Sequence, residues 1–532
     1  MLKKNIFPAK ITDLFLIIIS SILIGIFYNF KTIESEFLSC FQDSSILKVA
    51  TFVLEIGAVI SVILVFFLAL SFNKILLKTF LIVTIFISTV YLYVLNKFGT
   101  ILDGAMIANA LESAGHADEV IDYSLGVYFL FFALVPALLI VKAEISPSNL
   151  RKKIIIGVAN VIFIALLQVT FASDKMLKIA FVQYSPANYV ASIYEYFDRF
   201  HNQLQQGKDR RSLSEFYKFQ SGKESKNFNV ILIIGESLRA DHLGLSGYER
   251  NTTPRLAAIP DLLNYTISAS FNTTTRSVTS MLSHRTKADF VDIPPEKSVV
   301  SVFKDLGFKT HWYSAQSSKE FRNGMLNIMA AEADDYFFRD RLRSSLRSHK
   351  IYDEALIPYL QSALKNGGHN FIVLHSFGNH VRFHERHPES FTVFTPECTL
   401  LPSSCPKKDV NNSYDNSVLY TDYFVSSVIE SLKGTNSILF FASDHGVFLG
   451  ENGVYANGGG DVENLDPVKK VPMFFYMTDQ LMRDKFFHKK FMAAAKKTKS
   501  INLSHDNLFD SLLDCSGVKS DLFDRDLSIC KN

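Results

Sequence analysis

Two different patterns of hydrophobic and polar positions follow each other along the chain. In the first third, long apolar runs recur with short polar segments between them, a pattern typical of helices that cross a membrane. From residue 227 onward, short runs of β-branched and aromatic residues alternate with amphipathic stretches, which predicts strands alternating with helices. We therefore expect a multi-pass α-helical membrane domain in residues 1–172, a connecting region in residues 173–226 and an α/β domain in residues 227–532.

Most of the apolar runs reach the ~20 residues that a helix needs to cross ~30 Å of hydrocarbon, and the fourth is marginal. The runs cover residues 11–30, 47–72, 75–95, 125–141 and 154–171. Basic residues gather before the first run, after the second and after the fourth, whereas the other loops are acidic. The positive-inside rule then places the N-terminus in the cytoplasm, and five crossings place everything after residue 171 outside. If the fourth run is a re-entrant hairpin instead, the large domain would lie in the cytoplasm.

The connecting region carries aromatic and apolar residues at helix-like spacing, followed by a charged run at residues 206–211. An amphipathic stretch next to a membrane either lies along the membrane surface or packs between the two domains. The sequence leaves both interpretations open.

Five strand-like runs are the strands expected in the α/β domain. They cover residues 229–235, 308–315, 370–378, 437–443 and 471–477. Helices are expected at residues 295–306, 352–365 and 415–432. This alternation predicts an α/β sandwich built on a largely parallel sheet.

Composition supports the membrane domain and argues against a nucleic-acid partner. Hydrophobic residues make up 48% of the chain, a high share for a soluble protein, and their excess lies in the first third. The formal net charge is only +3, and no basic stripe with interleaved aromatic residues is present, so no nucleic-acid partner is expected.

Four of the five cysteines fall into two close pairs in the domain expected outside the cytoplasm. Cys398 lies near Cys405, Cys515 and Cys530 flank the C-terminal segment, and Cys40 is left over. Disulfides persist in extracytoplasmic compartments, so two disulfides would agree with the predicted topology. Four unpaired, buried thiols are the alternative.

Polar side chains that can bind a metal directly follow two of the expected strands. Glu236 follows the run 229–235, and Asp444 and His445 follow the run 437–443. Open α/β folds bind ligands at the carboxyl ends of their strands, and two carboxylates with a histidine can hold one divalent cation. A threonine-rich segment, residues 270–283, could supply a hydroxyl nucleophile that the cation activates.

Each of these features also has a purely structural interpretation. Asp444 could cap a helix, Glu236 could be a first-turn acidic residue favoured by the helix dipole, and the threonines could be ordinary strand or turn residues. Their combination in one chain, in this order, favours a catalytic site.

Several longer motifs make the chain recognisable. They are IIGES (residues 233–237), GYERNTTPRL (247–256), SVTSMLS (277–283), HSFGNH (375–380), YDNSVLYTDYF (414–424) and SDHGVFLGENGVY (443–455). In this order they resemble the bacterial phosphoethanolamine transferases, a family of the alkaline phosphatase/sulfatase superfamily that includes the lipid A modifying and mobile colistin resistance enzymes. The resemblance covers nearly the whole chain.

The resemblance implies an alkaline-phosphatase-like, that is sulfatase-like, fold for the second domain, with a zinc site. Glu236, Asp444 and His445 match the family's zinc ligands. These three side chains leave a fourth tetrahedral position, which the oxygen of Thr274 could fill.

The nucleophilic threonine of the family aligns best with Thr274, and Thr273 and Thr275 are the alternatives. A bound Zn²⁺ lowers the pKa of a coordinated oxygen by many units, which would activate the hydroxyl. Attack on a phosphodiester would leave a phospho-threonine that a second acceptor then cleaves. His380 matches the histidine that contacts the phosphoethanolamine group, and it could donate a proton to a leaving oxygen.

The chain also departs from the family pattern. Asn457 stands where the family has a histidine, and Val447 stands where it has a glutamate. An asparagine can hydrogen-bond a phosphate but is a weak metal ligand and does not titrate, which puts a second metal in doubt. Arg276 could supply the charge that binds the phosphate.

In the membrane domain, residues 104–113 (GAMIANALES) resemble the family segment that contacts the donor headgroup. Asn109 and Ser113 match its polar positions, and Asp118 and Glu119 lie next to its acidic position. A polar loop helix with solvated charges is the alternative.

The sequence thus predicts an enzyme of the bacterial inner membrane with its catalytic domain in the periplasm. As a monomer, it would transfer phosphoethanolamine from phosphatidylethanolamine in the lipid bilayer to lipid A, a core sugar or another envelope glycan. Two alternatives are a lipoteichoic-acid-type glycerol-phosphate transferase and a non-catalytic membrane sensor with a degenerate metal site.

Overall fold

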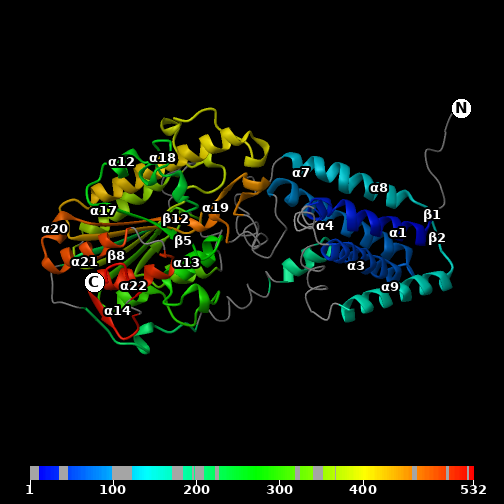
Figure 1. The fold of residues 1–532 in the computed structure, drawn as a ribbon, viewed down its shortest axis with the longest axis horizontal. Helices are drawn as coiled ribbons and strands as arrows, with labels where there is room; N and C mark the ends of the chain where they lie inside the picture. Colours follow the sequence, from blue (N-terminus) through cyan, green and yellow to red (C-terminus); the bar gives the residue numbers. More distant parts are fainter. Residues whose placement is uncertain are drawn as a thin grey trace. The chain divides into compact units, whose positions relative to one another are not determined.

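The computed structural model describes residues 11–34, 37, 46–98, 123–170, 184–194, 197, 209–221, 227–317, 324–339, 351–365, 367–457, 464–498, 502–523 and 526–531. Among these, the residues up to 197 form one compact unit and those from 209 onward form another. The first unit is a bundle of apolar helices, and the second is built around a seven-stranded sheet (Figure 1).

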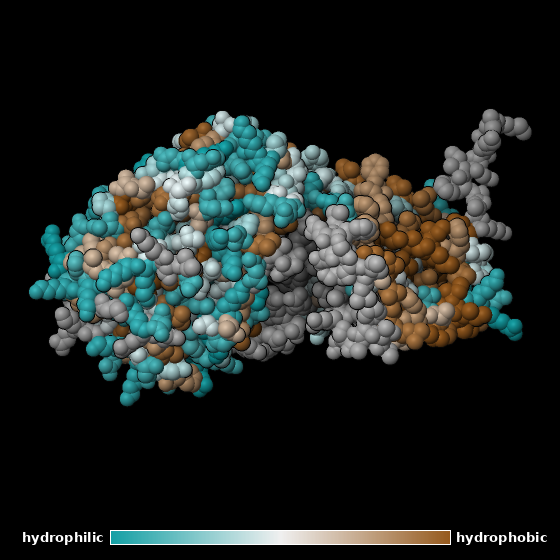
Figure 2. Space-filling view, in the orientation of Figure 1, coloured by the Kyte–Doolittle hydropathy of each residue, from teal (hydrophilic) through white to brown (hydrophobic). Residues whose placement is uncertain are grey.

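The helical unit consists of long helices with few polar residues. Its elements are β1 (Ile11–Thr12), α1 (Asp13–Ile22), η1 (Leu23–Phe27), α3 (Ile46–Leu70), α4 (Lys74–Phe98), α7 (Tyr123–Tyr128), η3 (Phe129–Leu134), α8 (Val135–Lys142), β2 (Ile145–Ser146) and α9 (Leu150–Thr170). Among the described helices, three stretches are long and apolar enough to cross a membrane: Val49–Leu70, Lys74–Lys97 and Tyr123–Lys142. Hydrophobic side chains cover much of this unit's visible surface (Figure 2), as lipid contact requires.

Three of the five predicted spans therefore coincide with helices that can cross a bilayer. The first predicted span coincides with Asp13–Phe27, which is shorter, and the fifth coincides with α9, whose first turn is basic. An ion pair between two buried side chains, with Lys153 Nζ 2.5 Å from Asp13 Oδ2, joins the start of α1 to the start of α9. A total of five crossings stays a prediction.

Residues 184–194, which belong to the predicted connecting region, pack within the helical unit. Tyr184 is 1% exposed and shares an apolar core with Phe67 of α3 and Leu81 of α4. This part of the chain is therefore fixed by contacts inside the bundle.

The second unit is organised around a sheet with the strand order β5-β12-β9-β4-β8-β6-β7. The strands are β4 (Asn229–Gly235), β5 (Leu263–Ser268), β6 (Lys309–Ser314), β7 (Asp335–Phe337), β8 (Asn370–His375), β9 (Ser437–Ser443) and β12 (Lys470–Met477). Neighbouring strands are parallel except β12, which is antiparallel to both β9 and β5. The largely parallel sheet is confirmed.

Helices cover both faces of the sheet because the central strands are apolar on both sides. On β4, Val230, Leu232 and Ile234 belong to one apolar core, and Ile231 and Ile233 belong to the other, as strand alternation requires. The helices over the first core are α13 (Thr274–Leu282), α14 (Val299–Asp305), α15 (Met325–Ala330), α21 (Lys485–Lys496) and α22 (Asp506–Cys515) (Figure 1). The helices over the second core are α12 (Pro254–Ala257), α17 (Ile357–Lys365) and α18 (Lys407–Ser431).

The structure adds two strands to the sheet and changes the boundaries of all three predicted helices, the first of which (295–306) is the shorter α14 (Val299–Asp305). The added strands, β5 and β7, form the two edges of the sheet. Helix α18 begins at Lys407, before the predicted residue 415, and the predicted helix 352–365 starts as a 3-10 turn at Asp353–Leu356. Smaller antiparallel pairs are β3 (Phe219–Ser221) with β13 (Val518–Ser520) and β10 (Phe448–Leu449) with β11 (Tyr455–Ala456).

Both predicted cysteine pairs form disulfides, Cys398–Cys405 and Cys515–Cys530. The first closes a loop before α18, and the second ties the end of α22 to the C-terminal residues. The alternative of four unpaired thiols is therefore wrong, and Cys40 lies outside the described residues.

Candidate active site

Three metal-ligating side chains converge where β4 and β9 end. These parallel strands are neighbours, with Gly235 paired to Ser443, so Glu236 on one strand lies beside Asp444 and His445 on the other. One ligand atom from each residue lies within 4.8 Å of the other two. All three residues are 1% exposed or less, which makes this a buried cluster.

The chain turns sharply after Glu236. Ser237 has a φ of 56°, in the left-handed region that few non-glycine residues adopt. Its N–H donates to Asp444 Oδ1 (3.0 Å), and its hydroxyl donates to Glu236 Oε1 (2.6 Å). The turn therefore orients both carboxylates, and strain of this kind is typical of functional sites.

The ring of His445 is oriented by the backbone. Its Nδ1 lies 2.7 Å from the carbonyl oxygen of Gly446, which can only accept, so Nδ1 carries the hydrogen. Nε2 then holds the lone pair, and it lies 3.3 Å from Asp444 Oδ2 and 3.7 Å from Glu236 Oε1. This is the tautomer that a metal ligand needs.

Thr274 is the first residue of α13 and points into the same cluster. Its Oγ1 donates to Glu236 Oε2 (3.0 Å) and lies 3.3 Å from His445 Nε2. Thr273 is the N-cap residue of this helix. The amino end of a helix offers free N–H groups and a partial positive charge, so an anion at Thr274 would be stabilised.

The buried carboxylates fit a cation between them. Asp444 Oδ2 is buried and has no hydrogen-bond partner among the described residues. Burial and the neighbouring Glu236 carboxylate raise the pKa of Asp444 to about 7. Burial also opposes ionisation of Glu236, but His445, His380, His375 and the hydrogen bond from Ser237 together outweigh burial and lower the pKa of Glu236 to about 2. Two carboxylate oxygens, an imidazole nitrogen and the Thr274 oxygen form a donor set that suits tetrahedral Zn²⁺.

The loop after β8 brings His380 to the same edge of the sheet. Gly378 has a φ of +45°, and a Cβ there would lie 2.9 Å from the backbone oxygen of Glu236. The N–H of Asn379 donates to that same oxygen (3.0 Å). His380 stacks on the ring of Phe377, with 5.3 Å between centroids, and interacts electrostatically with Glu236.

Of two predicted phosphate-binding residues, Arg276 has other side-chain partners in this structure and Asn457 is held through its backbone. Arg276 Nε donates to Asp292 Oδ1 (3.0 Å), and its guanidinium lies 3.9 Å from the centroid of the Phe271 ring. Asn457 accepts a hydrogen bond through its backbone oxygen from Asn272 Nδ2 (2.9 Å), which ties it to the threonine segment. The two remaining predicted substrate-binding residues lie outside the described residues: Asn109 and Ser113.

Val447 supports the loop that carries Asp444 and His445. It is 1% exposed and packs in an apolar core, and its carbonyl oxygen accepts from Arg239 Nη1 (3.1 Å). Arg239 also pairs with Glu451, with Nη1 2.7 Å from Oε1.

Gln316 holds the carboxylate of Glu236, one of the predicted metal ligands, a role that the sequence did not indicate. Its Nε2 donates to Glu236 Oε2 (3.0 Å) and to the carbonyl oxygen of Ser376 (2.9 Å). The only sequence signal is that Gln316 directly follows the expected strand 308–315, as Glu236 directly follows the expected strand 229–235. A second-layer hydrogen bond of this kind orients a metal ligand.

His505, the residue before α22, links the threonine segment to the end of β9. Its Nδ1 accepts from the N–H of Ser270 (3.1 Å), and its Nε2 donates to the carbonyl oxygen of Ser443 (2.9 Å). It therefore fixes the two segments that carry Thr274 and Asp444 relative to each other.

Two family models match the chain. Residues 228–518, more than half of it, match the model described as Sulfatase, and residues 60–199 match the model described as Phosphoethanolamine transferase EptA/EptB.

Individual relatives extend the similarity along the chain. The Kdo(2)-lipid A phosphoethanolamine 7''-transferase of Salmonella typhimurium is 26% identical over 94% of this chain and 93% of its own length. The phosphatidylethanolamine transferase Mcr-1 of Escherichia coli is 27% identical over 81% of this chain and 84% of its own. The integral membrane protein lipooligosaccharide phosphoethanolamine transferase A (EptA) from Neisseria meningitidis superposes with a TM-score of 0.80 at 21% identity over 97% of both chains, which shows a common fold.

Proposed function

The chain belongs to the phosphoethanolamine transferases of the sulfatase family, and we propose that it transfers phosphoethanolamine from phosphatidylethanolamine to lipid A. Thr274 would be the nucleophile, and Glu236, Asp444 and His445 would hold one zinc ion. One observation carries this proposal: the Thr274 hydroxyl oxygen lies 3.0 Å from Glu236 Oε2 and 3.3 Å from His445 Nε2. The nucleophile and the metal ligands thus share a single site.

Each residue of the site has a distinct task. Zinc, when bound, lowers the pKa of a coordinated hydroxyl and offsets negative charge on a phosphate. The strained turn at Ser237 and the hydrogen bond from Gln316 keep the Glu236 carboxylate oriented toward the cluster. The amino end of α13 favours the anion that Thr274 attacks.

Transfer would take place in two half-reactions. In the first, the Thr274 hydroxyl gives its proton to water, its oxygen attacks the donor phosphorus, and the bond between phosphorus and the glycerol oxygen breaks, which releases diacylglycerol and leaves phosphoethanolamine on Thr274. His380 would protonate the leaving oxygen. In the second, a phosphate oxygen of lipid A attacks the same phosphorus, the bond to Thr274 breaks, and the threonine oxygen takes up a proton.

The catalytic unit would face the periplasm, on the outer side of the inner membrane. Its two disulfides support this location because disulfides are stable in the bacterial periplasm and rare in the cytoplasm. The named relatives support lipid A as the acceptor, since one of them is described as a Kdo(2)-lipid A phosphoethanolamine transferase.

The test incubates the full-length protein in lipid nanodiscs with phosphatidylethanolamine labelled in its ethanolamine group and with lipid A. Mass spectrometry then measures diacylglycerol and modified lipid A, which we expect in equal amounts. Diacylglycerol without labelled lipid A would contradict the acceptor, and transfer from phosphatidylglycerol but not from phosphatidylethanolamine would contradict the donor.

A further inference from the structure

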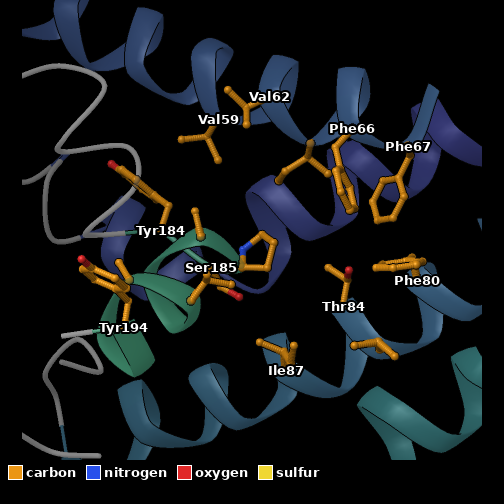
Figure 3. A pocket seen from close by; sticks show the side chains of 16 residues that line it. Val59, Val62, Phe66, Phe67, Phe80, Thr84, Ile87, Tyr184, Ser185 and Tyr194 are labelled. Carbon is orange, nitrogen blue, oxygen red and sulfur yellow. The ribbon is translucent and has the colours of Figure 1, made fainter. Parts of the chain in front are cut away.

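The helical unit contains an apolar cavity with a volume of about 610 Å³. Side chains of α3 and α4 point into it from two sides, and residues 184–194 close one end (Figure 3). None of the described residues that line it carries a charge. Its volume falls within the roughly 300–1,000 Å³ that is usual for ligand sites.

The wall of the cavity includes the middle of a helix that is long and apolar enough to cross a membrane. Thr84, on its wall, is ten residues after Lys74, the first residue of α4. At a rise of 1.5 Å per residue this is about 15 Å, half of the ~30 Å hydrocarbon core. Beside the middle of a helix that crosses a membrane, a ligand is surrounded by lipid chains and not by water.

The cavity has a buried floor and an exposed rim, and both are apolar. On the floor, Phe67 is 0% exposed and Tyr184 is 1% exposed, whereas Val190 on the rim is 63% exposed. Phe66 and Phe80, whose ring centroids are 5.9 Å apart, lie at one end. Because α3 and α4 can cross a membrane, an exposed rim of this kind opens sideways to lipid.

The wall formed by residues 184–194 is anchored by buried polar contacts. Asn29 Nδ2 donates to the carbonyl oxygen of Ser185 (3.1 Å), and the N–H of Ser185 donates to Asn29 Oδ1 (2.8 Å). The hydroxyl of Ser185 donates to Ser88 Oγ (2.9 Å). All three residues are buried, so the wall is held in place and the cavity is preorganised for a ligand.

We propose that this cavity binds one acyl chain of the phosphatidylethanolamine donor. The identification of the ligand as the donor lipid rests on the proposed function. Its identification as a hydrocarbon chain follows from the apolar lining of the cavity and from the place of the cavity along α4. A water-soluble ligand would need charged or polar partners and an aqueous entrance, and the apolar rim favours neither. A donor held by one chain keeps its headgroup available for reaction while diffusion in the bilayer is restricted.

Photolabelling tests the site independently of transfer. The full-length protein is placed in phosphatidylcholine nanodiscs with a small fraction of phosphatidylethanolamine that carries a diazirine in one acyl chain. After illumination, peptide mass spectrometry maps the adducts, which we expect on α3, α4 and residues 184–194, with competition by unlabelled phosphatidylethanolamine. The Thr274→Ala variant should be labelled as strongly as the wild type, because labelling of the cavity does not require transfer. The proposal of an acyl-chain site can therefore fail while the transferase proposal holds, and the reverse.

Two cavity-filling variants and a matched control complete the test. Ala191→Phe and Ala187→Phe place a ring in the cavity from the same wall. Each should lower cavity labelling about tenfold or more, because displacing as few as two methylene groups costs about this much affinity. Ala159→Phe makes the same change at an exposed position of α9 outside the cavity and should have no effect.

Three results would overturn the proposal. One is a set of adducts spread evenly over exposed positions such as Val158 and Val161 of α9. Another is unchanged cavity labelling in both folded phenylalanine variants. The third is labelling by a diazirine fatty acid but not by the phospholipid.

Discussion

At the scale of single residues, the place of Thr274 at the start of α13 determines where its hydroxyl points. It faces Glu236 and His445, whereas Thr273 precedes it as the N-cap residue. We expect Thr274→Ala to lower transfer by about a thousandfold or more, since the covalent step loses its nucleophile. Zinc content should be retained because the other three ligands remain.

Intact-protein mass spectrometry with phosphatidylethanolamine alone checks this expectation. The wild type should gain one phosphoethanolamine group and Thr274→Ala none, whereas Thr273→Ala and Thr275→Ala serve as controls that keep the adduct. An adduct that persists in Thr274→Ala and disappears in one of the neighbours would show that the nucleophile is misassigned.

Removal of the metal is expected to destabilise the catalytic unit more strongly at about pH 8 than at about pH 6. Burial and Glu236 raise the pKa of Asp444 to about 7, so without metal Asp444 is neutral at the lower pH and charged beside Glu236 at the higher pH. A raised carboxyl pKa stabilises the folded state at low pH, and this contribution is lost as the pH rises through about 7. Zinc at a hundredfold excess over its Kd would restore about 2.7 kcal/mol.

Melting temperatures of the zinc-loaded and chelator-treated protein at the two pH values measure this effect. Asp444→Asn is the control, because it cannot ionise and should abolish the difference between the two pH values. A loss of melting temperature that is equal at both pH values in the wild type would contradict a paired-carboxylate metal site.

The sequence indicated those site residues that directly follow long apolar strands. Glu236, Asp444 and His445 stand out because each strand ends abruptly in a charged or metal-ligating side chain. Gln316 and His505 could not be found in this way, since a single amide or imidazole has many structural roles. Their functions arise from contacts across more than 60 positions of the sequence, Gln316 with Glu236 and His505 with Ser443, that only the folded chain creates.

At the scale of elements, the disulfide Cys515–Cys530 is expected to contribute strongly to the stability of the catalytic unit. It closes 15 residues and anchors the C-terminal residues to α22, which lies over one face of the sheet. Loop-closure entropy for a loop of this size is about 3 kcal/mol. The double variant Cys515→Ser with Cys530→Ser should therefore lose about that much free energy of unfolding, measured by urea titration.

The pair Cys398–Cys405 is the natural comparison for that measurement. It closes only 7 residues, for which the same relation predicts about 2.4 kcal/mol. An equal or larger loss from the shorter loop would mean that loop length does not govern the effect and that the loop before α18 has a further structural role.

Strands that are buried on both faces were predictable, and edge strands were not. The five expected runs became β4, β6, β8, β9 and β12, which are almost entirely buried, although β6 (KTHWYS) mixes polar and aromatic residues. The edge strand β5 alternates apolar and polar residues over six positions, and β7 has only three residues. Their pairing is decided by the neighbouring strand rather than by a local pattern.

At the scale of the whole molecule, contacts inside the helical unit bear on the number of membrane crossings. Strand β1 pairs in parallel with β2, and Asp13 pairs with Lys153, so α1 and α9 start at the same end of the bundle. Lys78 Nζ donates to the carbonyl oxygens of Val141 (2.8 Å) and Ala143 (2.9 Å), which brings the start of α4 to the end of α8. A re-entrant fourth segment would instead leave the end of α8 beside the end of α4.

These contacts, with the basic residues at the same end, favour the proposed topology with the catalytic unit outside. Alkaline phosphatase fused after residue 226 should be active, and fusions after residues 73 and 148 should be inactive, because that reporter folds only where disulfides form. Green fluorescent protein fused at the same positions, which fluoresces only in the cytoplasm, should give the opposite pattern and controls for expression. Fluorescence after residue 226 together with phosphatase activity after residue 148 would mean that Tyr123–Lys142 does not cross, and the contacts of Lys78 would then need another explanation.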